Sequence, residues 1–128
     1  MNATDLTVIN KFFYEQTDST NIRAKEFACS KKNENPQEEK NLLPIKAIFV
    51  ANSQTAGKGR LGRSFFSPKD CGIYLSIIFE TDFLEYENDV TLITPKVAVS
   101  VCKTLEKFGC KDCKIKWVND IFKKKKKV

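Results

Sequence analysis

Residues 54–63 read QTAGKGRLGR, and this stretch, taken with its flanks, decides the fold. It holds three of the five glycines and two of the three arginines, in a chain that otherwise uses lysine for positive charge. Arginine offers a planar, two-pronged grip on phosphate or carboxylate that lysine lacks. Closely spaced glycines let backbone N–H groups approach an anion. The stretch therefore predicts a phosphate-binding loop.

The flanks decide whether a helix or a strand follows this loop. Residues 57–62 fit the dinucleotide-binding pattern G-x-G-x-x-G and residues 57–64 approximate a P-loop, but both motifs need a helix to begin at the last glycine. Instead, Pro68 and the β-rich run 73–79 follow, and a buried strand is expected before the loop at 47–51. The pattern predicts strand, basic loop and strand, which disfavours both nucleotide-binding motifs.

Length, charge and cysteine usage limit the class of protein. A chain of 128 residues with 41% apolar residues is expected to form one folded domain. The net charge of +6 is typical of nucleic-acid binders, but residues 110–128 carry the whole excess. The lysine run 123–127 is therefore best explained as a solvated turn, not as a nucleic-acid or membrane patch. Five unevenly spaced cysteines and the lack of a signal-like or transmembrane run predict a reducing cytoplasm.

Cys110 and Cys113 form a single C-x-x-C pair. The sequence has no histidine and no second such pair, so structural thiols are favoured over a redox pair or a zinc site. The absence of histidine also removes the usual catalytic triad and proton shuttle. Chemistry is expected to rest on arginine, lysine, aspartate and backbone donors.

The remaining pattern predicts an α+β protein. Short strands are expected at 12–14 and 114–117, and an exposed loop at 31–41. One helix is expected from a cap at Ser19 or Thr20 to about Cys29, with its polar start serving either as an ordinary cap or as a ligand site. Its inward residues are expected to be Ile22, Ala24, Phe27 and Ala28.

A second helix is expected from about Thr94 to Phe108, with Pro95 in its first turn and Gly109 ending it. Its buried stripe is predicted to be Val97, Val101, Leu105 and Phe108.

Three motifs in order resemble those of biotin protein ligases. Residues 18–21 (DSTN) match the family's D-S-T-N, and residues 116–121 (KWVNDI) match its K-W-P-N-D-[IL]. Residues 57–68 (GKGRLGRSFFSP), followed by GIYLS, resemble G-R-G-R-x-G-R-x-W-x-S-P followed by N-L-Y-L-S. The departures are Lys58 for Arg, Phe65 for Trp and Val118 for Pro, and none removes an obvious catalytic group. The resemblance spans roughly residues 10–128, and the related lipoate ligases match less well.

The resemblance implies the fold shared by biotin ligases, lipoate ligases and class II aminoacyl-tRNA synthetases. This is a mixed, mainly antiparallel sheet with helices packed on it, and residues 1–128 are expected to form a C-terminally incomplete catalytic domain. The chain would be a fragment or a truncated gene model, or the remaining sheet strands would be absent. It is expected to be weakly active or inactive alone, with no room for an N-terminal DNA-binding domain.

The implied activity is that of a ligase that uses ATP and Mg²⁺ to form biotinyl-5′-AMP. It would then pass biotin to a lysine of a carboxylase's biotin carboxyl carrier domain, with no nucleic-acid or membrane partner. The alternatives are a lipoate protein ligase and a non-catalytic nucleotide- or RNA-binding module.

The resemblance also assigns roles to single residues. The biotin-binding set is Ser19, Thr20, Asn21, Gln54, Gly57, Arg60 and Lys127. The set for ATP and the adenylate is Lys58, Gly59, Arg60, Arg63, Phe65, Asn119 and Asp120, with Mg²⁺ expected near Asp120 but no fixed metal ligands. Arg60 and Lys127 are the catalytic candidates. Lys127 falls at the family's lysine counted from Asn119, although the five lysines of the run are otherwise equivalent.

Overall fold

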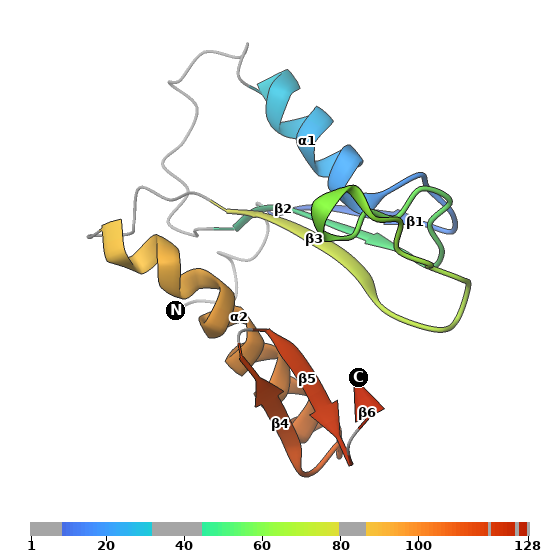
Figure 1. Ribbon diagram of the computed structural model, residues 1–128. Helices are drawn as coiled ribbons and strands as arrows, with labels where there is room; N and C mark the ends of the chain where they lie inside the picture. Colours follow the sequence, from blue (N-terminus) through green and yellow to red (C-terminus); the bar gives the residue numbers. More distant parts are fainter. Residues whose placement is uncertain (1–8, 32–44, 80–86, 118, 125, 128) are drawn as a thin grey trace. The chain divides into compact units, whose positions relative to one another are not determined.

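The computed structural model describes residues 9–31, 45–79, 87–117, 119–124 and 126–127. The chain divides into two compact units, residues 1–81 and 82–128. Each unit contains one three-stranded sheet and one α-helix among its described residues (Figure 1).

The first unit is a sheet with a helix packed on one face. Its elements are β1 (Asn10–Tyr14), α1 (Thr20–Lys31), β2 (Ile45–Ala51) and β3 (Tyr74–Phe79). The central strand β2 pairs in parallel with β1 and antiparallel with β3. The predicted order of strand, loop and strand is confirmed, because only a short 3₁₀ turn, η2 (Arg60–Gly62), interrupts the loop between β2 and β3.

The core of the first unit lies between α1 and β2. Ala47 and Phe49 are fully buried because alternate residues of β2 face the helix. The Phe49 ring stacks on Phe12, with 4.8 Å between centroids, and meets Phe27 of α1 edge-on at 5.7 Å. Ala24 is also buried, and its small side chain lets α1 lie close to the sheet.

Helix α1 begins where the sequence predicts. The Ser19 carbonyl accepts the first helical hydrogen bond, from the Arg23 N–H at 3.1 Å, so Ser19 is the N-cap residue. The helix continues past Cys29, and Ser30 Oγ donates to the Phe27 carbonyl at 2.8 Å in its last turn. Lys31, expected to open the exposed loop, closes the helix instead, and the rest of that loop lies outside the described residues.

The second unit is an antiparallel sheet packed against a long helix. Its elements are α2 (Glu87–Lys107), β4 (Cys113–Lys116), β5 (Asp120–Lys123) and β6 (Lys126–Lys127), with β5 in the centre. α2 packs on β4 and β5. The lysine run forms more than the expected turn: it ends β5, turns at Lys124 with φ 46°, and pairs back as β6.

The start of α2 differs from the prediction. The helix begins at Glu87, not near Thr94, so Pro95 lies inside it and not in its first turn. An interior proline loses one backbone hydrogen bond and costs about 3 kcal/mol. A helix of 21 residues that packs on two strands retains its other bonds and contacts, so proline marks a preferred boundary and not an obligatory one. The helix ends at Lys107, one residue before the predicted Phe108, and Gly109 follows in the turn with φ +87°.

The buried face of α2 also differs from the prediction. Val97 and Val101 are 52% and 43% exposed, and Phe108 is 87% exposed, whereas Ala98 and Cys102 are buried. The small side chains of Ala98 and Cys102 let the helix approach β4 and β5. The buried face of α2 is therefore shifted by one residue from the predicted stripe, which contains the larger apolar residues. Within the described part of the chain, no helix has the length and apolar character needed to cross a membrane.

Candidate functional site

The ends of β1 and β2 hold the start of α1 beside the glycine loop. Thr17 forms a parallel bridge with Gln54, which extends the β1–β2 pairing past both strands. The N–H of Thr55 donates to the Thr17 carbonyl at 2.9 Å, and the N–H of Ala56 donates to the Asp18 carbonyl at 2.8 Å. Backbone hydrogen bonds therefore fix the residues just before α1 against the start of the loop.

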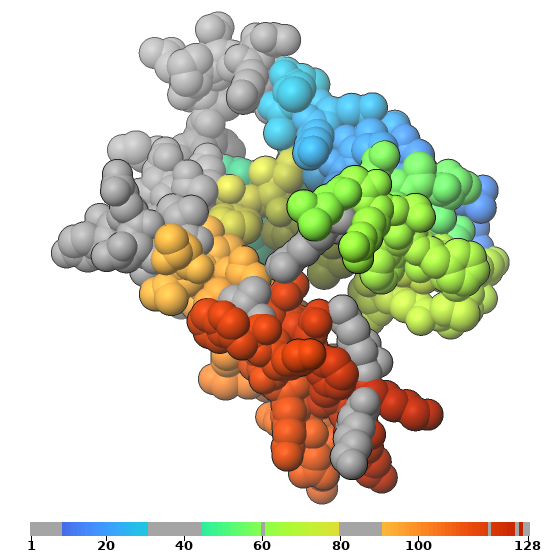
Figure 2. All heavy atoms as spheres, in the orientation of Figure 1, coloured from blue at the N-terminus to red at the C-terminus, as the bar shows by residue number. Residues whose placement is uncertain are grey.

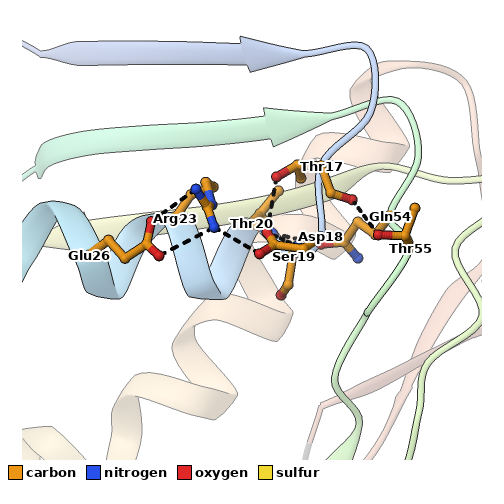
Figure 3. A network of polar contacts seen from close by, with 8 residues as sticks. All are labelled: Thr17, Asp18, Ser19, Thr20, Arg23, Glu26, Gln54 and Thr55. Atoms are coloured by element: carbon orange, nitrogen blue, oxygen red, sulfur yellow. Dashed lines mark hydrogen bonds and ion pairs between the residues drawn. The ribbon is translucent and has the colours of Figure 1, made fainter.

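Gln54 connects the helix to the returning arm of the loop, and Figure 3 shows it beside Thr20 at the helix start. Its Oε1 accepts the Thr20 N–H at 2.8 Å and lies 3.2 Å from Thr20 Oγ1. Its Nε2 donates to Ser67 Oγ at 3.0 Å, and Ser67 Oγ donates to the Phe65 carbonyl at 3.1 Å. Gln54 thus holds two protein segments together as well as lining the site. Ser67 was not among the predicted site residues, although it belongs to the Ser-Pro pair that ends the loop motif.

Asp18 stabilises the start of α1 from outside the helix (Figure 3). Its Oδ1 accepts the Ser19 N–H at 2.6 Å and the Thr17 hydroxyl at 3.1 Å, while Oδ2 accepts Arg23 Nη2 at 2.7 Å. These bonds, chiefly that from the Ser19 N–H, lower the pKa of Asp18 below its usual value. Arg23 also pairs with Glu26 at 3.0 Å. Sequence reasoning missed Arg23, although it is the third arginine of a lysine-rich chain.

The glycine loop closes on itself as a narrow hairpin. The Phe65 N–H donates to the Gly57 carbonyl at 2.8 Å, and the Gly59 N–H donates to the Arg63 carbonyl at 2.7 Å. A Cβ on Gly57 would lie 2.4 Å from the Phe65 carbonyl oxygen and 2.7 Å from Ser67 Oγ, so no other residue fits without displacement. Gly57 therefore serves close packing within the loop, and the Gly59 N–H is not available to an anion. At Gly59 this differs from the expectation that the glycines let backbone N–H groups approach an anion, because this N–H is already paired within the loop.

The tip of the loop is basic and exposed. Arg60 begins the turn η2, and Gly62 has φ +73°, so the predicted positive φ occurs there. Lys58, Arg63 and Phe65 are exposed, and neither cation forms an ion pair with another described residue. Figure 2 shows the bright green atoms of this loop on the molecular surface. Two unpaired cations on one hairpin favour an anionic ligand.

A cleft of about 390 Å³ opens beside Gln54, where β1 and β2 end. This volume is in the range of sites for small molecules. Its lining is Glu15, Gln16, Ser53, Gln54, Phe66, Ser67, Pro68 and Lys69. Lys69 Nζ donates to Glu15 Oε1, and this bond is the main reason why the pKa of Glu15 is lowered. No sequence motif pointed to that ion pair.

The other predicted site residues lie in the second unit. Asn119 is exposed in the turn between β4 and β5, and Asp120 is the half-buried first residue of β5. Lys127 lies in β6, in register with Phe122. Among the described residues, no group of three or more His, Cys, Asp or Glu side chains is arranged to hold a metal ion.

The two cysteines of the C-x-x-C pair lie side by side as free thiols. Cys113 Sγ is 3.4 Å from Cys110 Sγ and donates to the Cys110 carbonyl at 3.1 Å. Burial, followed by the contact with Cys110, raises the pKa of Cys113 to about 11. The thiol is therefore protonated and unreactive near neutral pH, which agrees with a structural role.

Comparison with known proteins identifies the family. The pattern of the biotin/lipoate A/B protein ligase family matches residues 14–128, so the chain belongs to this family. The bifunctional ligase/repressor BirA of Bacillus subtilis is 35% identical over 82 residues, which cover 63% of this chain and 24% of the relative. BirA of Escherichia coli is 30% identical over 80 residues, covering 62% and 24%. The chain spans about a quarter of the length of these curated relatives.

Solved structures support the same assignment. The biotin protein ligase of Aquifex aeolicus, in complex with biotin and ATP, has a TM-score of 0.63 at 31% identity, over 93% of this chain and 44% of that one. The ligase of Leishmania major, in complex with biotinyl-5-AMP, has a TM-score of 0.61 at 22% identity, over 93% and 49%, and shows a likeness of fold alone. The predicted α+β fold of the class II synthetase type, and the resemblance to the N-terminal part of a ligase catalytic domain, are confirmed.

Proposed function

We propose that this chain is part of an ATP-dependent biotin protein ligase. The enzyme joins biotin and ATP into biotinyl-5′-AMP and then passes biotin to a lysine of a carboxylase's biotin carboxyl carrier domain. The observation that carries the proposal is that Gln54 ties the start of α1 to the basic loop. Neutral hydrogen-bonding groups thereby lie beside cations, which suits a ligand with a polar ring at one end and an acyl phosphate at the other.

The neutral end of the site binds the ureido ring of biotin. Ser19, Thr20 and Asn21 offer hydroxyl and amide groups at the helix start, where Gln54 accepts the Thr20 N–H and Ser76 Oγ bonds to Asn21 Oδ1. Gly57 lets the loop pack closely beside Gln54 and Ser67 at this end of the site. Ser19 and Thr20 are almost fully buried, so their hydroxyl groups are shielded from competing water.

The charged end of the site binds the phosphates. Both reaction steps are displacements at crowded anions, so catalysis rests on positioning and on charge neutralisation. Arg60 and Arg63 are assigned to the phosphates with Lys58 assisting, Gly59 keeps the loop narrow, and Phe65 offers an aromatic face to the adenylate.

Asn119 and Asp120 are assigned to ATP and its Mg²⁺. Their side-chain oxygens are the hard donors that Mg²⁺ prefers, and Mg²⁺ takes one or two carboxylates together with phosphate oxygens, so no larger cluster of protein ligands is required. When bound, the ion neutralises charge on the triphosphate. All described cysteines are free thiols, which supports a reducing cytoplasm as the location.

Binding by the chain itself tests the ligase proposal without requiring turnover. Calorimetry would compare non-hydrolysable analogues of biotinyl-AMP and lipoyl-AMP with AMP alone. A biotin ligase prefers the biotinyl compound by tenfold or more. Preference for the lipoyl compound would indicate a lipoate ligase, and equal binding of all three would indicate a nucleotide-binding module.

Exchange of labelled pyrophosphate into ATP tests whether the chain catalyses formation of the adenylate. We expect slow exchange that depends on biotin, because the chain spans only part of its relatives. The variant Arg63→Ala should lose this exchange, and Lys25→Ala, which removes an exposed cation of α1, should retain it. Equal rates in these two variants would remove Arg63 from the site.

The assignment of Lys127 is tested against a neighbouring lysine. Lys127 belongs to β6, whereas Lys124 is exposed in the preceding turn. We expect Lys127→Ala to abolish biotin-dependent exchange and Lys124→Ala to leave it nearly unchanged, because an exposed turn charge contributes little. Similar loss in both variants would show that the run acts only as a patch of positive charge.

A further inference from the structure

Ser76 is a polar residue at a core position of β3. Alternate residues of β3 are buried, and Ser76 is 7% exposed opposite Phe49, the central core residue. A buried hydroxyl costs free energy unless it is hydrogen-bonded. The partners of Ser76 therefore show what this residue does.

Both partners belong to the first turn of α1. Ser76 Oγ lies 2.9 Å from Thr20 Oγ1 and 2.8 Å from Asn21 Oδ1. A serine has one hydroxyl proton, and the amide oxygen of Asn21 only accepts, so this proton lies between Ser76 and Asn21. Because its proton is used in this way, Ser76 Oγ can only accept a hydrogen bond from the Thr20 hydroxyl.

The second neighbour of the Thr20 hydroxyl is also an acceptor. The Thr20 N–H donates to Gln54 Oε1, and Ser67, which donates its own proton to a carbonyl, must accept from Gln54 Nε2. These bonds fix the orientation of the Gln54 amide. Its Oε1, 3.2 Å from Thr20 Oγ1, therefore faces the threonine as an acceptor. Both of these neighbours of the Thr20 hydroxyl are therefore acceptors, so its proton is directed to one of them and neither uses the lone pairs of its oxygen.

We propose that Ser76 is a positioning residue for ligand binding. It holds the rotamer of Thr20 and directs the Thr20 proton inward, so that Thr20 meets the ligand as a hydrogen-bond acceptor. The group recognised at this point is a ligand N–H and not a ligand carbonyl. This inference rests on the proposed function, in which the ligand is biotin and the N–H belongs to its ureido ring.

The ligand half is tested with biotin and its two cyclic carbamate analogues, in which oxygen replaces one or the other ureido N–H. A site built to bond an N–H rejects an analogue that lacks it. We expect the wild-type chain to bind one carbamate at least tenfold more weakly than biotin by calorimetry. Ser76→Ala should weaken biotin binding about tenfold and reduce that preference to roughly threefold or less. An equal loss for biotin and both carbamates, or no loss, would overturn the inference.

Tyr74→Phe provides the matched control. Tyr74 is a buried residue of the same strand, two positions before Ser76, and its hydroxyl donates to the carbonyl of Pro68, a loop residue, at 2.9 Å. This variant removes a buried hydroxyl but should keep the wild-type preference for biotin over the carbamate. A collapse of the preference in Tyr74→Phe as well would show a general structural effect and overturn the specific role of Ser76.

The positioning half is tested without any ligand. Three-bond NMR couplings to the Thr20 methyl carbon report its χ1 rotamer. We expect one rotamer in the wild type and in Tyr74→Phe, and averaging in Ser76→Ala. A single unchanged rotamer in Ser76→Ala would overturn the proposal. If that variant does not fold, Ser76→Cys, which preserves volume but is a weak donor, takes its place.

The two tests separate the inference from the proposed function. A wild-type chain that binds neither biotin nor the carbamates overturns the ligase proposal and the ligand half together. The couplings then still decide whether Ser76 holds Thr20.

Discussion

The first turn of α1 and the tip of the glycine loop belong to one candidate site but are built in opposite ways. At the helix start, Ser19 and Thr20 are 2% and 4% exposed, and hydrogen bonds tie Thr20 to Gln54 and Ser76. At the loop tip, Lys58 and Arg63 face solvent and form no ion pair with another described residue.

The difference follows from the two kinds of chemical group that the site is proposed to bind. A neutral hydrogen bond contributes about 1 kcal/mol and discriminates between ligands only when its partners are desolvated and held in place. A cation retains its attraction for phosphate at the surface, and an exposed loop allows it to adapt. Changes in the buried network should therefore alter stability and binding together, whereas changes at the tip should alter binding alone.

Substitution of Gly57, which lies where the hydrogen-bond network of Gln54 meets the loop, should have the largest effect on stability. Gly57→Ala places a methyl group 2.4 Å from a backbone oxygen, and such overpacking costs roughly 3 kcal/mol. Gly62→Ala is the matched control, because Gly62 has no neighbour within 4 Å and only its φ of +73° opposes a side chain, at about 1 kcal/mol. Chemical denaturation would measure both. A Gly57 variant as stable as the Gly62 variant would contradict the close packing described for the loop.

Substitution of Arg63 should alter ligand binding and leave stability nearly unchanged, in contrast to substitution of Gly57. We expect Arg63→Ala to weaken binding of a biotinyl-AMP analogue by about 10- to 100-fold, because a charge-assisted hydrogen bond contributes roughly 1.5–3 kcal/mol. The affinity for biotin alone, which lacks the phosphate, should hardly change, and the free energy of unfolding should stay within about 0.5 kcal/mol of wild type. Calorimetry and denaturation together test this separation, and a destabilised Arg63→Ala would end the contrast between the two regions.

The sequence predicts the local structure of both regions well. A continuous apolar run indicated β2 and a β-rich run indicated β3, and Pro68 with the second run excluded a helix behind the loop. The D-S-T-N motif located the start of α1. These signals succeed because β-propensity, helix caps and proline act over a few neighbouring residues.

The hydrogen-bond network of Thr20, Gln54 and Ser76 and the packing of α2 could not be predicted from such local signals. Gln54 reaches Thr20 across 34 residues of sequence, and Ser76 reaches it across 56, so these bonds exist only once the sheet is formed. Ser76 lies within the apolar β3 run, where its position alone gives no sign of its partners. In α2 the buried face is chosen by the small size of Ala98 and Cys102, and hydrophobic periodicity does not measure volume.

The substitution Asp18→Asn should have the smallest effect on stability, because the Asn side chain still accepts the Ser19 N–H and only the charge is lost. The wild-type carboxylate faces the N-terminus of α1 and pairs with Arg23, and its pKa is lowered, so its stabilising contribution is complete above the unfolded pKa of about 3.9. That contribution disappears as the pH falls through the lower folded pKa.

We therefore expect wild type to melt at a slightly higher temperature than Asp18→Asn at pH 6, and the difference to shrink below about pH 4. Glu26→Gln is the control, since it removes the other carboxylate on Arg23 at an exposed i,i+3 pair and should change the melting temperature little at either pH. A difference between wild type and Asp18→Asn that stays constant from pH 6 to pH 3 would mean that hydrogen-bond geometry, and not charge, holds the helix start. The binding end of the site would then depend on neutral contacts alone, and the contrast with the charged loop would be sharper still.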